Sequence, residues 1–521
     1  MTNDSLFQAI LDNPDDDTPR LVYADWLEEN GDPDWAERIR IECELPTHEA
    51  EDIAPKLHEL RKRREQLIRK HREAWKTHRY KSGRLLWQRG FLALEGSPES
   101  FLQPHAVTWW DQHKQHIGWV AWAGDRLRAG IAEQLPPDLV QRTAEIRRTN
   151  RALLRQNEIN EIAHYANVRK LRCSYPGIRS KTAFAPLETM EQLRSLKLYS
   201  QDHFVSEPEA ESLPAFPHLR QLHFEHGITG NAVRVLRKFK TLEELDLGQV
   251  FGLTTESWLQ LESLTKLRKF RFFLNTSLAV HDPAPCVFPK WPNLRELSMR
   301  HWRTEEDVAC LDQLPKLERL TLSATGSPSD SPLSLSALPT LTKLQCLHVH
   351  RNQRRLTGLG NLKQFPNLQE LRLVGSEDQT DWDQLPPLPG LRALEFLNSY
   401  WAGLGVLPKQ SAKIIVERCP NVERLTLPGS PGAAAIHALS KLKHVKALEV
   451  GYGRPSRIWQ ALTKFQGITY LKLPGSSHSE NIGQHVKKFP ALEILDLRGD
   501  WLARDHLQEI RKHCPKLVVL T

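Results

Sequence analysis

The stretch PKLERLTL, residues 315–322, contains the pattern on which the fold depends. Its apolar residues are Leu317, Leu320 and Leu322, so two residues of any type separate the first pair and one separates the second. Leu320 and Leu322 alternate as in a short strand with one buried side. The phrase opens at fifteen positions that follow one another at intervals of 23 to 31 residues: Val168, Leu193, Leu219, Leu242, Leu267, Leu294, Leu317, Leu344, Leu368, Leu391, Val422, Val445, Ile468, Leu492 and Leu517.

A short phrase that recurs at this period predicts a solenoid of stacked units. Between the phrases lie stretches such as 436–444, whose apolar residues recur every three or four positions as in a helix. One unit cannot bury its leucines alone, so neighbouring units share a continuous apolar spine. We therefore expect the leucines to point inward and the residues between them to face outward from the strands.

Over residues 168–521 the phrase resembles the leucine-rich repeat, LxxLxLxxN/C. The resemblance implies an α/β fold: a curved, horseshoe-shaped solenoid with a parallel sheet on its concave face. The sequence departs from the family at the last position, where only Asn275 and Asn352 supply asparagine. We therefore expect no continuous asparagine ladder at that place.

The first part of the chain differs from the rest. Residues 1–48 have the stop signals and apolar spacing of three short helices, and 56–80 those of one basic amphipathic helix. The strings DDDTPRLVYADWLEENGDPDWAERIRIECEL and QRGFLALEGSPESFL, at 15–45 and 88–102, resemble the repeat-companion domain found in many planctomycete proteins. The resemblance implies a bacterial protein and supplies no catalytic residue.

These patterns predict four parts. They are a helical companion domain at 1–48, a basic amphipathic helix and connector at 49–90, an N-terminal cap with degenerate repeats at 91–167, and the repeat solenoid at 168–521. Eight of the fifteen tryptophans precede residue 123, and we interpret them as sealing the end of the solenoid. A ligand platform is the alternative interpretation.

Charge is uneven along the 521 residues, which contain 71 basic and 63 acidic side chains. Residues 1–55 hold 16 acidic and 3 basic residues, whereas 56–90 hold 13 basic and 3 acidic residues. The favoured interpretation is that the two segments dock on each other, because charge runs usually form local pairs. A basic arm for a polyanion is the alternative.

Composition excludes several classes of protein. No run approaches 18 apolar residues, and the acidic amino end lacks the pattern of a secretory signal, so we expect a cytoplasmic protein without a membrane span. The seven cysteines are widely spaced and include no CxxC pair. No phosphate-binding loop, HExxH or EF-hand motif occurs, so we expect no enzyme, cofactor or metal.

The middle strands give the candidate site. Their outward positions combine cations with aromatic residues, and Arg and Trp are common anchors of protein interfaces. The candidate partner-binding residues are Lys269, Arg271, Phe273, Arg300, Trp302, Arg319, His348, His350 and Arg372.

These residues predict a non-enzymatic scaffold with a protein partner on the concave face. One alternative is polyanion or nucleic-acid binding through the basic 56–90 helix and the basic middle strands. A second is an enzyme with an unrecognised site near Cys346 and His348. A solvated surface without a partner is the plain interpretation, and the oligomeric state is not predicted.

Overall fold

The fold was examined in a computed structural model of the protein. It describes residues 3–12, 16–45, 55–75, 83–88, 91–114, 117–124, 127–148, 153–175, 182–199, 204–274, 288–325, 331–352, 354–375, 380–397, 407–427, 432–450, 459–473, 482–498 and 504–520. The chain divides into two compact units, Met1–Leu242 and Glu243–Thr521. None of the described helices is long and apolar enough to cross a lipid bilayer.

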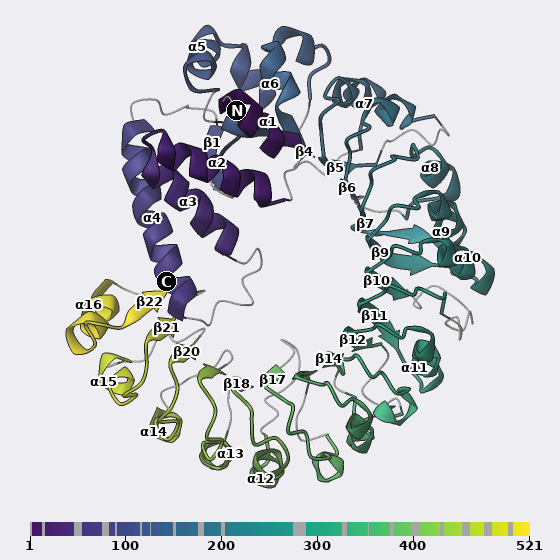
Figure 1. Ribbon diagram of the computed structural model, residues 1–521. Helices are drawn as coiled ribbons and strands as arrows, with labels where there is room; N and C mark the ends of the chain where they lie inside the picture. Colours follow the sequence, from purple (N-terminus) through teal and green to yellow (C-terminus); the bar gives the residue numbers. More distant parts are fainter. Residues whose placement is uncertain are drawn as a thin grey trace. The chain divides into compact units, whose positions relative to one another are not determined.

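The second unit is a ladder of parallel strands (Figure 1). Apart from the connection between Leu274 and Glu296, the described segments between successive strands contain a helix or a 3₁₀ turn. Within this unit the strands line the inner side of an arc and the helices its outer side. The strands pair in the order β9 (Glu244–Phe251), β10 (Lys269–Leu274), β11 (Glu296–Trp302), β12 (Arg319–Ala324), β14 (Cys346–His350), β16 (Glu370–Val374), β17 (Ala393–Leu397), β18 (Arg424–Leu427), β19 (Ala447–Val450), β20 (Tyr470–Lys472), β21 (Ile494–Asp496) and β22 (Val518–Leu520).

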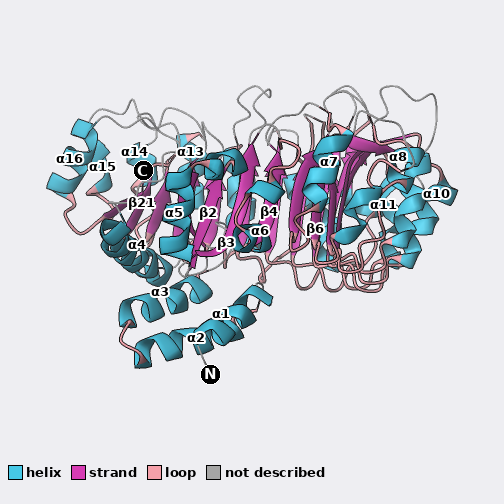
Figure 2. Ribbon diagram, turned by 90° about the horizontal axis from the view of Figure 1, so that it is seen from above, coloured by secondary structure: helices cyan, strands magenta, loops and turns pink. Residues whose placement is uncertain are grey.

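Figure 2 shows strands and helices of the chain from above, and the return segments of this unit lie outside its strands (Figure 1). They include the helices α10 (Thr255–Leu259), α11 (Glu306–Ala309), α12 (Lys409–Arg418), α13 (Ala433–Leu439), α14 (Trp459–Leu462), α15 (Ile482–Val486) and α16 (Arg504–His513). A small second sheet pairs β13 (Leu333–Ser334) with β15 (Leu356–Thr357).

The predicted leucine spine is confirmed. Leu320 is aligned with Leu297 and Leu347 on the two neighbouring strands, and all three side chains are buried. Thirteen of the fifteen residues that open the phrase are buried to at least 97%. The other two, Leu492 and Leu517, open the last phrases and are half-buried, because fewer repeats follow to cover them.

A ladder of side chains joins successive turns, but at a place that we did not predict. Asn293, Asn367 and Asn421 each directly precede the opening residue of a phrase. Their Nδ2 atoms donate to carbonyl oxygens of the preceding repeat, namely those of Thr265 at 3.0 Å, Thr342 at 2.7 Å and Pro389 at 3.0 Å. The turn carbonyls are thus satisfied without asparagine at the end of the phrase.

Arg354 ties three consecutive repeats together from the inside. Its guanidinium is 2% exposed and donates to the carbonyls of Thr325 at 3.2 Å, Ser331 at 3.1 Å and Arg303 at 3.0 Å. Arg303 follows β11, whereas Thr325 and Ser331 follow β12 and Arg354 follows β14. A buried cation thereby satisfies three loop carbonyls at once.

The first unit begins the same architecture earlier than residue 168. Parallel pairing runs from β2 (Phe91–Gly96) through β3 (Ile117–Gly124), β4 (Thr143–Arg148), β5 (Lys170–Ser174) and β6 (Ser195–Tyr199) to β7 (Gln221–Phe224). The returns in this unit include α5 (Pro104–His113), α6 (Pro137–Gln141), α7 (Gln156–Ala163), α8 (Glu207–Glu211) and α9 (Gly230–Val233). A strand that we did not predict, β1 (Gly83–Gln88), pairs antiparallel with β2.

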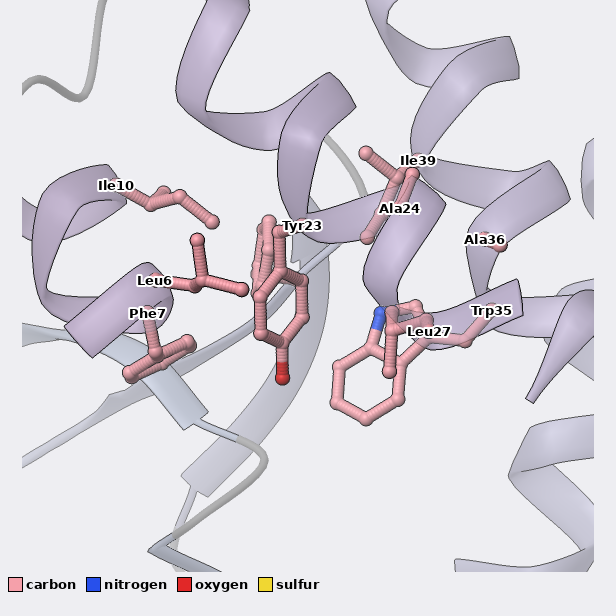
Figure 3. Packing of buried hydrophobic residues seen from close by; sticks show 10 residues of the cluster. Leu6, Phe7, Ile10, Tyr23, Ala24, Leu27, Trp35, Ala36 and Ile39 are labelled. Carbon is pink, nitrogen blue, oxygen red and sulfur yellow. The ribbon is translucent and has the colours of Figure 1, made fainter. Parts of the chain in front are cut away.

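The three predicted amino-terminal helices are α1 (Asn3–Asp12), α2 (Thr18–Glu29) and α3 (Pro33–Glu44). In their shared core Tyr23 lies between Phe7 and Trp35, with ring centroids 6.1 and 6.4 Å away (Figure 3). Phe91 of β2 joins the same core, 5.7 Å from the ring of Tyr23. Phe91 thereby joins the core of the three helices to the first parallel strand.

Two tryptophans interpreted as a seal are fully buried in this unit. Trp110 of α5 and Trp122 of β3 are at most 1% exposed, and the Nε1 atom of Trp110 donates to Oδ1 of Asp138 at 3.1 Å. Side chains with so little exposure cannot form an open ligand platform.

Candidate functional site

The candidate site lies on the side of the sheet that faces away from the leucine spine, which we call the strand face. Successive side chains of a strand point to opposite sides, so on β14 the buried Leu347 and Val349 alternate with His348 and His350, which are half-buried. The other predicted residues of this face are half-buried or exposed in the same alternation, namely Lys269, Arg271, Phe273, Arg300, Arg319 and Arg372.

The prediction for Trp302 is wrong. By strict alternation Trp302 would follow Arg300 on the strand face, yet its side chain is fully buried. The pairing of β11 with β12 shifts register between Met299 and Trp302, and Trp302 is aligned with Ala324. An irregularity of this kind turns the following side chain to the other side of the sheet.

Parallel register arranges the strand face in transverse rows. The first row contains Glu244, Lys269, Glu296, Arg319, Cys346, Glu370, Ala393 and Arg424, and the second contains Asp246, Arg271, Ser298, Thr321, His348, Arg372, Glu395 and Thr426. Opposite charges meet along both rows: Lys269 lies 2.9 Å from Glu296, and Arg271 lies 3.3 Å from Asp246. These exposed pairs contribute little to stability, but they neutralise the face locally.

Glu370 is the centre of a denser cluster. Its Oε1 lies 2.8 Å from Nε2 of His348 and its Oε2 accepts from Arg424 at 3.0 Å. Arg424 and Arg372 also contact Glu395, at 3.3 and 2.5 Å. We call these five residues the Glu370 cluster. The hydrogen bond from His348 and the charges of both arginines outweigh burial and lower the pKa of Glu370 to about 2.

Three members of this cluster, Glu370, Glu395 and Arg424, were not among the predicted site residues. The sequence places them at outward positions of their phrases, but it does not show which charges meet across the strands. The usable signal was the opposite sign of residues at the same phrase position in neighbouring repeats, as with Arg372 in LQELRL and Glu395 in LRALEF.

The geometry gives no support to a nucleophile at Cys346. Its Sγ lies 3.9 Å from Oε2 of Glu370, and Nε2 of His348 is directed at the same carboxylate. Burial and the charge of Glu370 raise the pKa of the Cys346 thiol to about 11. A reactive cysteine needs an environment that favours the thiolate, and this one opposes it. Within the described ranges no three His, Cys, Asp or Glu side chains are grouped to hold a metal ion.

His350 has a different environment. Burial, which disfavours the protonated ring, is the main reason that the pKa of His350 is lowered to about 4. Interactions with His348, Arg372 and Arg300 lower it further. The imidazole is therefore neutral at pH 7, and the field that it experiences is positive.

Within the basic segment at 56–90, the predicted helix at 56–80 is described as α4 (Pro55–Trp75), which packs against α3. Residues 76–80 of the predicted helix lie outside the described residues. Arg63 holds the carboxylate of Glu37 with two hydrogen bonds of 2.8 and 2.7 Å, and Lys70 pairs with Asp34. These contacts agree with the interpretation that the acidic and basic segments dock on each other.

The regular alternation of strand and return, with one buried leucine row, defines an α/β solenoid of the leucine-rich-repeat type. No protein-family model matches the chain, and the curated proteins give no match. The chain is similar to a solved internalin from Listeria monocytogenes at 16% identity, covering 66% of this chain and 89% of that one, with a TM-score of 0.38.

Two further solved structures resemble this chain with similar identities and TM-scores. A leucine-rich-repeat protein of Leptospira interrogans is 14% identical over 80% of this chain and 92% of its own, with a TM-score of 0.33. A TLR13 chain, solved in complex with ssRNA13, is 15% identical over 75% of this chain and 66% of its own, with a TM-score of 0.40.

Proposed function

We propose that this protein is a non-enzymatic scaffold that binds a protein partner on the strand face of its second unit. The observation that carries the proposal is the presentation of Lys269, Arg271, Phe273, Arg300, Arg319, His348, His350 and Arg372 on one ladder of parallel strands. Side chains on adjacent paired strands have fixed spacing, which reduces the ordering cost of binding. Function is assigned here from this surface, since the fold alone does not assign it.

The mixed charge of the face favours a protein over a polyanion. Lys269 and Arg271 already have acidic partners on neighbouring strands. Binding to a phosphate backbone depends on cations that neutralise phosphates and release counterions, whereas protein interfaces combine both signs with aromatic groups. The pairing of Arg63 and Lys70 reduces the free positive charge of α4 in the same way.

The setting of this scaffold is part of the proposal. We infer a bacterial cytoplasmic protein in which residues 1–48 form a companion domain and 49–90 a connector. In this proposal 91–167 cap the solenoid of 168–521. The buried free thiols of Cys173 and Cys419 are consistent with a reducing compartment.

Affinity purification with the full chain as bait tests the proposal. We expect Arg271→Glu combined with Arg319→Glu to reduce recovery of the specific partner at least tenfold, because two outward cations of the face are reversed. Lys266→Glu combined with Lys343→Glu makes the same charge change at exposed turn positions and is the matched control. Equal recovery with both pairs would contradict the proposal.

A salt titration separates the polyanion alternative. The full chain is mixed with labelled duplex DNA at low and at physiological ionic strength. Counterion release requires affinity to fall steeply as salt rises. We expect no salt-dependent binding; a steep loss of measurable affinity would favour the alternative.

A further inference from the structure

A third row of the strand face lies at the carboxyl ends of the middle strands and differs from the first two. It contains Phe273, Arg300, Ser323, His350, Val374 and Leu397, which we call the edge row. Register aligns His350 with Ser323 on one side and with Val374 on the other, and Val374 with Leu397. Phe273 of β10 and Arg300 of β11 directly follow the last aligned pair of those strands, Phe272 and Met299, and so lie next to the aligned members of the row.

The edge row has no acidic member, whereas the first two rows contain both acidic and basic side chains. Arg300 is exposed and the other five side chains are half-buried. The side chains of Arg372 and Arg300 add positive charge around His350. Apolar groups lie at both ends of the row, Phe273 at one and Val374 with Leu397 at the other.

We propose, as an extension of the proposed function, that the edge row docks an extended peptide segment of the partner with an acidic centre and apolar ends. Charge complementarity places one carboxylate opposite Arg300. The neutral imidazole of His350 can donate a hydrogen bond to a second carboxylate. Phe273 at one end and Val374 at the other accept apolar side chains. The inference rests on the scaffold function and adds the chemistry of the partner.

The spacing of the strands sets the length of the segment. Neighbouring strands lie about 4.8 Å apart, so the four steps from Phe273 on β10 to Val374 on β16 span about 19 Å. An extended chain advances about 3.3 Å per residue, so about six residue-to-residue steps separate the two apolar side chains of the peptide. The recognised pattern is therefore one apolar residue, about five residues that include two carboxylates, and a second apolar residue.

An array of eight-residue peptides tests this pattern with the labelled full chain. One set has leucine near both ends and two glutamates between them. A second set replaces glutamate with glutamine, and a third exchanges the apolar and acidic positions. We expect the first set to bind at least tenfold more tightly than the others. Equal binding of the glutamine set, or preference for the third set, would overturn the assignment of an acidic centre.

Variants of the full chain locate the binding. Arg300→Glu is expected to weaken the first set at least tenfold, and Leu397→Ser severalfold. Lys343→Glu, at an exposed turn outside the strand face, is expected to change it less than twofold. An equal loss with Lys343→Glu would overturn the location.

The two proposals fail in different ways. The edge-row proposal is rejected if the peptides show no preference and Arg300→Glu does not reduce recovery of the partner. The scaffold function is then still supported, provided that the bait recovers the partner. Partner recovery that is insensitive to the Arg271→Glu and Arg319→Glu pair rejects the scaffold function on this face.

Discussion

The Nε2 atom of His348 lies 2.8 Å from Oε1 of Glu370, and the two residues meet diagonally across neighbouring strands. His348 is aligned with Arg372, and Glu370 stands two residues earlier on the same strand as Arg372. A long side chain reaches such a diagonal neighbour readily. The carboxylate thereby has polar contacts with two other strands at once, with His348 on β14 and Arg424 on β18.

Replacing Glu370 with glutamine is expected to lower the free energy of unfolding at pH 7 by about 3 kcal/mol, because the pKa of this carboxyl is lowered by more than two units. A lowered carboxyl pKa stabilises the fold above about pH 4.5, and this contribution is lost as pH falls towards 2. Urea titrations at pH 7 and pH 3 should therefore show the difference between the two proteins narrowing by about half at the lower pH.

Glu423→Gln is the matched control for that comparison. Glu423 lies 3.4 Å from Arg392, and both side chains are about half exposed. An exposed pair of this kind is worth about 0–1 kcal/mol. A loss in Glu423→Gln as large as in Glu370→Gln would show that the Glu370 cluster has no special role.

His350 predicts a second dependence on pH. Its pKa is lowered from 6.5 to about 4, so between these values the unfolded chain binds more protons than the folded chain. Stability is therefore intact above pH 6.5 and decreases as pH falls through this window. At pH 5 the loss due to His350 is about 2 kcal/mol, and His350→Gln should remove it. Parallel stability curves for the two proteins between pH 7.5 and pH 5 would contradict this.

Gly358 is required by its turn for two reasons. Its φ is +73°, and a Cβ atom there would lie 2.6 Å from Oγ and 2.8 Å from the backbone nitrogen of Ser336. We expect Gly358→Ala to cost about 2–4 kcal/mol, from left-handed backbone strain plus the clash. Gly252→Ala, with φ +66° and no atom within 4 Å, carries the strain alone and should cost about 1–2 kcal/mol. Equal midpoints in thermal unfolding would refute the role of the clash.

The asparagine ladder predicts additive effects. Each of Asn293→Ala, Asn367→Ala and Asn421→Ala removes one hydrogen bond to the preceding repeat, worth about 0.5–1.5 kcal/mol. The three sites lie in separate repeats, so the triple variant should lose the sum within about 0.5 kcal/mol. Lys266→Ala, at the same place before its own phrase, is the control in urea titrations. A triple variant as stable as this control would contradict the ladder.

The sequence was sufficient for the spine and for the alternation of strand and return. Leucines at fixed intervals have one low-energy arrangement, because each leucine is buried only when neighbouring repeats stack on its own. Leu297, Leu320 and Leu347 form such an aligned row. The three amino-terminal helices were predictable for a similar reason, since Asp32 and Pro33 are local start signals that act within one turn.

The features that the sequence did not reveal depend on how the strands pair and on how far side chains extend across them. Trp302 has the outward phase of its phrase, but the irregular pairing of its own strand with β12 accompanies its burial on the other side of the sheet. Likewise β1 contains no repeat phrase and exists because β2 offers a free edge. The Glu370 cluster needed the relative positions of four strands, which no single phrase encodes.

The guanidinium of Arg354 bonds to loops of the two repeats before its own. Stacked repeats held only by nearest neighbours can unravel from an end, one repeat at a time. A link that spans three repeats makes their rupture a joint event. When the second unit is pulled mechanically from its ends, single repeats should therefore unfold in small steps. The repeats of β11, β12 and β14 should unfold together, at a higher force.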